Sequence, residues 1–354
     1  MLCWNRWSAT FSDDGRKWIS GMVIIDASNT SDDNVYYYSF CGNDSTRGAA
    51  DMNENVELPS LPLVYWRLLK PRVVMLLQIT AVCGVVAYNL LNENIVDKDD
   101  IIRVIKQSLV VLIGGTLTGG GAGTINMWYE RDLDNKMSRT DKRPIPMGHI
   151  SPEHALTFGI FCVSLGSVIL WKYGSIEAGA IAALSAIFYV LIYTVWLKPR
   201  TAQNIVIGGA AGSTPPLIGW AVAGGTVTDL IPWLMFVIIF LWTPPHFWAL
   251  SLLKVDEYRK VGLPMLPVVK GEEYTRNSIV AYSTILLLCT VILGYQGGLG
   301  RLYLIMATVL GGYFVYVSNR LRREPTSENT FRVFRYSINY LALIFPAIVI
   351  DLYV

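Results

Sequence analysis

Apolar residues dominate the chain from Val73 onward, in nine segments separated by shorter polar stretches. Each segment is close to the roughly 20 residues that an α-helix needs to cross the hydrocarbon core of a bilayer. The segments are approximately 73–91, 107–127, 155–171, 177–196, 203–223, 230–250, 277–296, 299–319 and 336–354. None shows the alternation of barrel strands, and glycine-rich stretches at 114–123 and 207–216 would let helices approach closely. The pattern predicts an all-α, polytopic membrane bundle of nine transmembrane helices.

Residues 1–60 differ from the rest of the chain. They are rich in Asp, Asn, Ser and Gly, and no run among them resembles the apolar core of a secretory signal. This composition is typical of a disordered tail, and a second interpretation is that translation begins at Met52. We therefore expect a polar tail over 1–60 and a membrane domain over 61–354.

Composition and net charge agree with a membrane protein. Hydrophobic residues make up 53% of the chain and charged residues only 16%, whereas a soluble protein carries about 25% charged residues. The net charge of +2 gives no indication of nucleic-acid binding. The five cysteines are scattered singly, so neither a disulfide framework nor a zinc site is expected.

Basic residues are divided unevenly between the two ends of the predicted helices. With the N-terminus placed in the cytoplasm, 20 of the 29 Lys and Arg residues fall in cytoplasmic segments and five in outer segments. Cytoplasmic loops of membrane proteins carry such an excess. We expect a cytoplasmic N-terminus and an outer C-terminus. Since no Arg-rich transit peptide is visible, a prokaryotic cell membrane is the expected location.

An acidic motif follows the second predicted span. Asn126, Glu130 and Asp134 are spaced i, i+4 and i+8, which places them on one helix face over about 12 Å. One or two carboxylates, completed by substrate phosphates and water, are how Mg²⁺ is usually bound. Basic residues that can reach phosphate oxygens follow directly: Arg139, Lys142 and Arg143. The competing interpretation is a solvated, charged loop that caps a helix.

Three further polar groups fall at the same predicted membrane face. Lys70 and Arg72 precede the first span, and Lys198 and Arg200 follow the fourth. The sixth span ends in TPPHFW (243–248), and we expect its double proline to break the helix before His246. Asp256 and Glu257 lie just beyond. Each group alone is weak evidence for a functional site, but a single site built from several cytoplasmic loops accounts for all of them.

These residues carry a family resemblance from about Leu61 to the C-terminus. The segments LLKPRVV (68–74), INMWYERDLDNKMSRTDKRPIP (125–146), YTVWLKPRTAQNIVIGGAAGSTPPLIGW (193–220) and TPPHFWALSLLKVDEYRKVGLPMLPVV (243–269) resemble protohaem IX farnesyltransferases. These form the haem branch of the intramembrane aromatic prenyltransferase superfamily. The resemblance implies Mg²⁺, farnesyl diphosphate as donor and haem B as acceptor. The product would be haem O for terminal oxidases, with haem A synthase or an oxidase as possible partners.

The resemblance also assigns roles to residues. Asn126, Glu130 and Asp134 would hold Mg²⁺ and, with Lys198, form the catalytic set. The remaining substrate-binding candidates are Lys70, Arg72, Arg139, Arg143, Arg200, His246, Phe247, Trp248, Asp256 and Tyr258. His246 is a candidate haem-iron ligand or acceptor-orienting group, against the simpler interpretation of a histidine hydrogen-bonded within the broken helix. Phe247 and Trp248 are candidates for stacking on a porphyrin.

Two departures and three alternatives remain. The family's first motif acid is usually Asp, but this chain has Glu130. The quinone-type prenyltransferases carry a second D-x-x-x-D after the sixth span, whereas this chain has His246 and a lone Asp256 with Glu257, as the haem branch does. The nearest alternative is a prenyltransferase acting on a quinone or chlorin-type acceptor, which the missing motif and TPPHFW disfavour. A transporter would place its acids deeper in the membrane, and a structural oxidase subunit has no need for the acidic face.

Overall fold

The computed structural model describes residues 10–11, 17–19, 22–24, 39–40, 59–93 and 97–354. The chain divides into two compact units, 1–58 and 59–354. In the first unit four strands form an antiparallel sheet in the order β1-β2-β3-β4: β1 (Thr10–Phe11), β2 (Lys17–Ile19), β3 (Met22–Ile24) and β4 (Ser39–Phe40). The predicted tail over 1–60 and start at Met52 fall largely outside the described residues and stay predictions.

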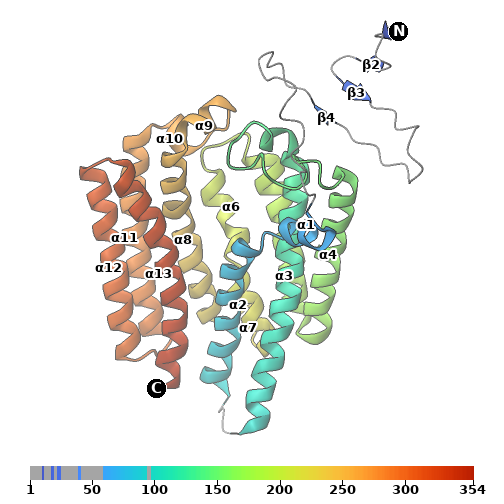
Figure 1. The fold of residues 1–354 in the computed structure, drawn as a ribbon. Coiled ribbons are helices and arrows are strands. Elements are labelled where there is room, and N and C mark those ends of the chain that lie inside the picture. Colours follow the sequence, from blue (N-terminus) through green and yellow to red (C-terminus); the bar gives the residue numbers. More distant parts are fainter. Residues whose placement is uncertain (1–9, 12–16, 20–21, 25–38, 41–58, 94–96) are drawn as a thin grey trace. The chain divides into compact units, whose positions relative to one another are not determined.

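The second unit is helical (Figure 1). Its elements are α1 (Leu61–Leu68), α2 (Pro71–Asn92), α3 (Lys98–Asp134), α4 (Pro152–Tyr173), α5 (Ile176–Ile187), the π-helix η1 (Phe188–Leu197), α6 (Asn204–Gly212), α7 (Pro215–Ala223), α8 (Leu230–Leu253), α9 (Val255–Lys260), α10 (Leu266–Val269), α11 (Glu272–Gln296), α12 (Arg301–Arg323) and α13 (Ser327–Tyr353).

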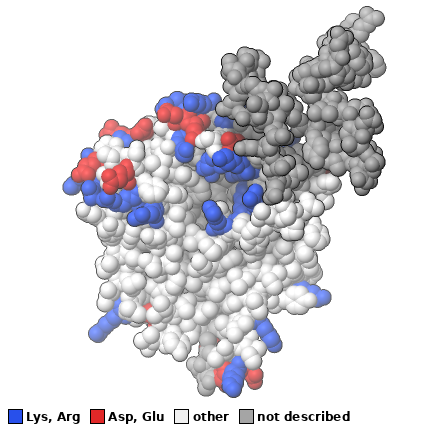
Figure 2. Space-filling view, viewed as in Figure 1, with Lys and Arg blue, Asp and Glu red and all other residues white. Residues whose placement is uncertain are grey.

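The nine predicted spans are confirmed. Within the described residues, nine helical spans are long and apolar enough to cross a membrane, with α5 and η1 forming one span and α6 and α7 another. Figure 2 shows charged side chains gathered at the two ends of the helical unit, with a nearly uncharged band between them. A band without charged side chains is what a lipid-facing surface requires, because charged groups are costly in hydrocarbon. The chain is a multi-pass membrane protein.

The second span is longer than predicted. α3 has 37 residues instead of the expected 107–127 and therefore extends about 55 Å. Its start is fixed by a capping box, in which Asp97 accepts from the backbone of Asp100 while the Asp100 carboxylate accepts from the backbone of Asp97. At its other end, α3 carries the acidic motif beyond the apolar segment.

The expectation that Pro244 and Pro245 break the sixth span is wrong. α8 runs without interruption from Leu230 to Leu253, with both prolines inside it. Prolines are tolerated in membrane helices when neighbouring groups compensate for the lost hydrogen bonds. The prolines have no N–H for the carbonyls of Phe240 and Leu241, four residues earlier, yet the helix continues past them. His246 therefore lies on a continuous helix.

Glycine allows α3 to lie directly against α4. A Cβ on Gly121 would be 2.7 Å from the carbonyl oxygen of Gly159, and one on Gly166 would be 2.5 Å from that of Gly114. Two pairs of glycines therefore set the spacing of these helices, as small residues do between membrane helices. Because successive spans alternate in direction, α3, η1 and α8 all end at the same end of the bundle, where α2 begins (Figure 1).

Candidate active site

The acidic motif forms a buried stripe at the end of α3. Asn126, Glu130 and Asp134 all lie on one helix face, and their exposed fractions are 2%, 6% and 2%. Buried acids of this kind need cationic or hydrogen-bonding partners, because desolvation of an unpaired charge is costly. Each of the three side chains has such a partner from another element.

Asn126 is held from two sides. Its Oδ1 accepts from Lys70 Nζ at 3.0 Å, and its Nδ2 donates to the hydroxyl of Thr194 at 3.2 Å. Lys70 precedes α2 in a left-handed conformation, with φ of 51°, which non-glycine residues rarely adopt and which is often retained at functional sites. Burial and, to a lesser extent, the charge of Arg143 lower the pKa of Lys70 to about 7. Gly123 makes room for the lysine side chain, whose Cδ would lie 3.3 Å from a Cβ there.

The two acids are each paired with a base. Lys198 Nζ donates to Glu130 Oε1, and Arg143 Nη1 donates to Asp134 Oδ2 at 2.7 Å. The bases are themselves largely shielded, with exposed side-chain fractions of 18% and 21%. Charge-assisted hydrogen bonds of this kind are stronger than neutral ones, especially where water is excluded.

The π-helix η1 explains how Thr194 and Lys198 reach α3. The Thr194 hydroxyl donates to the carbonyl of Tyr189 at 2.9 Å, and the Lys198 N–H donates to that of Tyr193 at 2.9 Å, both five residues back. With this wider turn, Thr194 and Lys198 face Asn126 and Glu130, and both pairs are four residues apart. π-helical turns are rare and are frequent at functional sites.

A small cavity of about 50 Å³ lies among these groups. It brings together seven residues singled out from the sequence: Glu130, Asp134, Arg139, Arg143, Lys198, Phe247 and Tyr258. Its other lining residues were not predicted from the sequence: Leu133, Met137, Thr140, Tyr193, Ile205, Leu250, Leu263 and Met265. Tyr193 and Thr194 precede Lys198 by five and four residues. This closeness to a predicted site residue was the one sequence signal that pointed to them.

Several sequence candidates lie away from this cavity. Arg200 donates to the carbonyls of Val195 and Trp196 at 2.9 and 3.0 Å, so it caps the end of η1. The side chain of Asp256 is 77% exposed and pairs with Arg259 at 2.7 Å. Arg72 is exposed, and it does not line the cavity.

Trp248 and His246 are packed against other helices. Trp248 is 2% exposed and meets the ring of Tyr282 edge-on at 5.1 Å. His246 is stacked between Trp242 on α8 and Phe334 on α13, with ring centroids 4.5 and 4.9 Å away. Its Nδ1 is 2.7 Å from the hydroxyl of Ser337. Of the three neighbours His246, Phe247 and Trp248, only Phe247 lines the cavity.

The loop after α3 is tied to α9 across the site. Glu257 accepts from Ser138 at 3.0 Å and from Lys254 at 2.7 Å. The hydrogen bond from Lys254 lowers the pKa of the Glu257 carboxyl below its usual value, although burial opposes this shift. This contact, together with the buried Tyr258 one position later, fixes α9 beside the acid–base cluster.

The donor set suits a hard, oxygen-binding cation. The described residues contain no group of three or more His, Cys, Asp or Glu side chains arranged to hold a metal. Two carboxylates and one amide oxygen are what Mg²⁺ uses when phosphate and water complete its shell. The arrangement can therefore bind a cation together with a polyphosphate.

Comparison with known proteins places the chain in a family. The profile of the UbiA prenyltransferase family matches residues 99–343. The chain is 43% identical to a protoheme IX farnesyltransferase of Synechocystis over 289 residues, 81% of this chain and 88% of that one. It is 45% identical to one of Symbiobacterium thermophilum over 246 residues, 69% and 82% of the two chains.

Solved structures share its fold. One of digeranylgeranylglyceryl phosphate synthase superposes with a TM-score of 0.65 at 20% identity, over 82% of this chain and 98% of that one. A UbiA homologue from Archaeoglobus fulgidus, bound to DMAPP and Mg²⁺, superposes with a TM-score of 0.58 at 16% identity, over 79% and 99%. The sequence and fold together show that this chain belongs to the UbiA prenyltransferase family, in its protohaem IX farnesyltransferase branch.

Proposed function

We propose that the chain transfers a farnesyl group from farnesyl diphosphate to a vinyl group of haem B, in a Mg²⁺-dependent reaction that yields haem O. The observation that carries this proposal is the pair of buried acid–base contacts, Glu130 with Lys198 and Asp134 with Arg143. They combine, at one end of the bundle, ligands for a cation and ligands for a diphosphate.

Asn126, Glu130 and Asp134 would hold the magnesium ion. When bound, the ion would neutralise charge on the diphosphate and so favour its departure. Glu130 supplies the same carboxylate ligand as the Asp usual at this position, on a side chain one methylene longer. A homologous fold has been solved with DMAPP and Mg²⁺, and another structure with GPP and Mg²⁺.

Lys198 and Arg143 would exchange partners on substrate binding. In the structure they neutralise Glu130 and Asp134, and the cavity between them is small. With a cation on the acids, the same bases are released to donate to phosphate oxygens. Arg139 also lines the cavity and adds a third positive group there. This exchange keeps every buried charge compensated before and after binding.

The reaction begins with cleavage of the allylic C–O bond, whose electron pair leaves with the diphosphate. Lys198, Arg139 and Arg143 stabilise the charge that develops on the leaving group, a contribution that is usually the largest in catalysis. Apolar lining residues exclude water from the allyl cation: Tyr193, Ile205, Phe247, Leu250, Leu263 and Met265. The vinyl π electrons form the new C–C bond, and water then adds to the haem-side cation and loses a proton.

His246 and Phe247 are the proposed contacts to the haem acceptor. Phe247 is 37% exposed and lines the cavity, so its ring can meet a porphyrin. His246 has its Nδ1 occupied by Ser337, which leaves only Nε2 for the acceptor. Its ring orientation is fixed by two aromatic neighbours and the Ser337 hydroxyl, as the neighbours of a metal-binding histidine fix its ring.

A quinone or chlorin-type acceptor is disfavoured. Curated relatives that are 41–45% identical over 69–86% of this chain carry the name protoheme IX farnesyltransferase. The test is incubation of the purified protein with farnesyl diphosphate, Mg²⁺ and haem B, followed by mass analysis of the haem. A hydroxybenzoate-type acceptor serves as the control substrate. Formation of a hydroxyethylfarnesyl haem supports the proposal, and prenylation of the hydroxybenzoate alone would contradict it.

We place the site on the cytoplasmic side of a prokaryotic cell membrane, with the C-terminus outside. The support is the distribution of basic residues, 20 of which lie in segments at the site end and five at the other end. A reporter enzyme active only outside the cytoplasm should work when fused after Val354 and fail when fused within 140–148. The opposite result would invert the orientation. Haem A synthase or a terminal oxidase would receive the product.

A further inference from the structure

A second hollow lies at the opposite end of α3 from the acid–base cluster. It has a volume of about 540 Å³ and is lined by Asp99, Ile102, Arg103, Lys106, Gln107, Val110 and Tyr173. The six residues from α3 recur every three or four positions, with two adjacent pairs at 102–103 and 106–107, so they form one stripe along the helix. Figure 1 shows α3 continuing past the end of α4, where Tyr173 is the last residue. The hollow is therefore a groove beside the first turns of α3.

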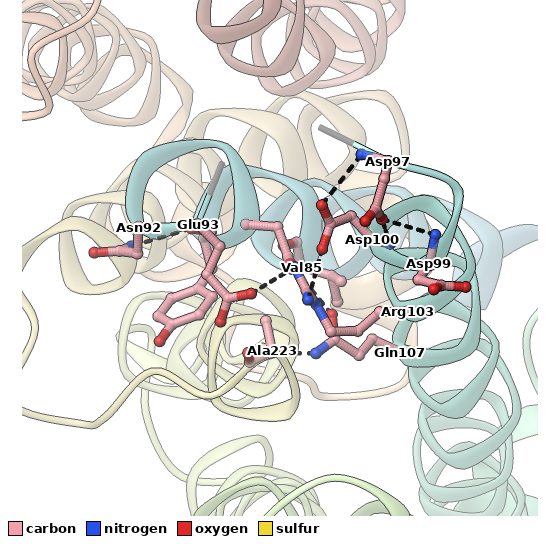
Figure 3. A network of polar contacts seen from close by, with 11 residues as sticks. Val85, Asn92, Glu93, Asp97, Asp99, Asp100, Arg103, Gln107 and Ala223 are labelled. Atoms are coloured by element: carbon pink, nitrogen blue, oxygen red, sulfur yellow. Dashed lines mark hydrogen bonds and ion pairs between the residues drawn. The ribbon is translucent and has the colours of Figure 1, made fainter. Parts of the chain in front are cut away.

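The charged groups of this groove differ in their pairing. Arg103 is bonded to Glu93 at 2.5 Å and to Asp100 at 2.9 Å, and Figure 3 shows it between the two carboxylates. Its charge is thus already compensated. Gln107, one turn further, is bonded to Asn89 and to the carbonyl of Ala223, which fixes this face against α2 and α7.

Asp99 and Lys106 are available to a ligand. Lys106 is exposed and has no hydrogen bond or ion pair to any described residue. The backbone N–H of Asp99 donates to Asp97 at 2.9 Å, while its carboxylate has no hydrogen bond or ion pair to a described residue and points away from the Arg103 network in Figure 3. The groove therefore presents one carboxylate and one ammonium group, seven residues or about 10 Å apart along the helix axis. Helix side chains lean toward the N-terminus, which brings the ammonium of Lys106 nearer to Asp99.

The polarity of the stripe changes along α3. The charged positions come first, and Val110, which lies within the apolar part of the span, ends it. Ile102, Ile105 and Leu109 on the same helix are 46%, 53% and 50% exposed. Four of the five basic residues at this end of the bundle are on α3 or beside Tyr173: Lys98, Arg103, Lys106 and Lys172. The groove is therefore zwitterionic at one end and apolar at the other, which is the order of polarity in a phospholipid from its headgroup to its acyl chains.

We propose that this groove binds one phospholipid with an ethanolamine headgroup, in the leaflet opposite the acid–base cluster. Lys106 donates to the phosphate, Asp99 accepts from the primary ammonium, and the acyl chains follow Ile102 and Val110. A choline headgroup offers Asp99 no N–H donor, and the ring of Tyr173 already has Lys172 over it at 5.8 Å. An anionic headgroup would leave the carboxylate of Asp99 beside another negative charge.

The test is binding of defined lipids to the delipidated, full-length protein in detergent, measured by native mass spectrometry. Phosphatidylethanolamine, phosphatidylglycerol and phosphatidylcholine are titrated separately, and free phosphoethanolamine is a fourth ligand. The variants are Lys106→Gln and Asp99→Asn. Lys98→Gln is the matched control, because it removes the same charge from an exposed position of the same helix end that does not line the groove.

We expect the wild type to bind one phosphatidylethanolamine about tenfold more tightly than either other lipid, as one charge-assisted contact would give. Lys106→Gln should weaken this binding about tenfold, and Asp99→Asn should remove the preference for ethanolamine over glycerol. Lys98→Gln should bind as the wild type does. Wild-type affinity in Lys106→Gln, equal binding of the three lipids, or equally tight binding of free phosphoethanolamine would each overturn the proposal.

Discussion

The ammonium group of Lys198 is hydrogen-bonded to the carboxylate of Glu130, which joins the end of η1 to the last turns of α3. Both side chains are largely shielded from water. A charge in such a place is costly without its partner, so each residue makes the other's burial possible. The same two groups are the proposed ligands of the cation and of the diphosphate, and this double use leads to the first predictions.

Removing the acids should abolish transfer without unfolding the protein. In Glu130→Gln and Asp134→Asn the side chains keep their size but lose the negative charge that a cation requires. We expect kcat for farnesyl transfer to fall at least about 100-fold, the scale of losing one group that stabilises transition-state charge. Asp132→Asn is the matched control, since Asp132 is exposed and off the acidic face. Full activity in both test variants would refute the site.

The contact between Glu130 and Lys198 should appear as coupling in stability. Lys198→Met leaves Glu130 buried without its cation, and we expect it to cost about 3 kcal/mol. Adding Glu130→Gln removes the stranded charge, so the double variant should be more stable than the Lys198→Met variant. A thermal double-mutant cycle in detergent should give a coupling energy of about 1–3 kcal/mol. Additive effects would show that the pair does not interact in solution.

The spans and the acidic face were predictable because both depend on local periodicity. Runs of about 20 apolar residues have few alternatives to a membrane helix, and the spacing of Asn126, Glu130 and Asp134 fixes their common face on any helix. The length of α3 was not predictable in the same way. Its first turns carry charged residues, and they are helical because of the capping contacts of Asp97 and Asp100.

Tertiary partners decided what the sequence left open. Pro244 and Pro245 do not break α8, because a helix in a packed bundle can lose hydrogen bonds that an isolated helix cannot. In the sequence, Lys198 and Arg200 are both basic residues that follow a span. In the structure Arg200 caps η1, whereas Lys198 pairs with Glu130. The orientation of the His246 ring depends on its contact with the hydroxyl of Ser337, which is 91 positions away. No local pattern reports such a contact.

Arg200 and Arg143 should differ in what their loss affects. Arg143 donates to Asp134 in the cavity, so Arg143→Ala should raise KM for farnesyl diphosphate about tenfold or more. Arg200→Ala removes donors from the carbonyls of Val195 and Trp196, and it should cost about 0.5–1 kcal/mol of stability with KM little changed. Steady-state kinetics and thermal melts on both variants separate the roles. An equal rise of KM would restore Arg200 to the diphosphate site.

His246 should show both a structural and a haem-binding effect. His246→Ala removes a ring stacked between Trp242 and Phe334, so we expect a loss of about 2–3 kcal/mol in stability. It should also remove the histidine-ligated absorption spectrum of bound haem B. Ser337→Ala leaves the ring in place and should retain that spectrum with weaker haem binding. If the haem spectrum of His246→Ala matches the wild type, histidine ligation is excluded and the packing role alone remains.

Gly208 tests how closely η1 must approach α6. A Cβ at this position would lie 2.1 Å from the ring of Tyr193, whereas one at Gly212 on the same helix would meet no atom within 4 Å. Gly208→Ala must therefore displace Tyr193, which lines the cavity beside Lys198, and overpacking of this kind costs about 1–3 kcal/mol. We expect transfer activity to fall about tenfold because a shift of 1 Å in a positioning element is enough for such a loss. Gly212→Ala should keep wild-type activity and stability. Since both substitutions add the same methyl group to one helix, equal activity in the two variants would mean that the position of Tyr193 does not matter for transfer.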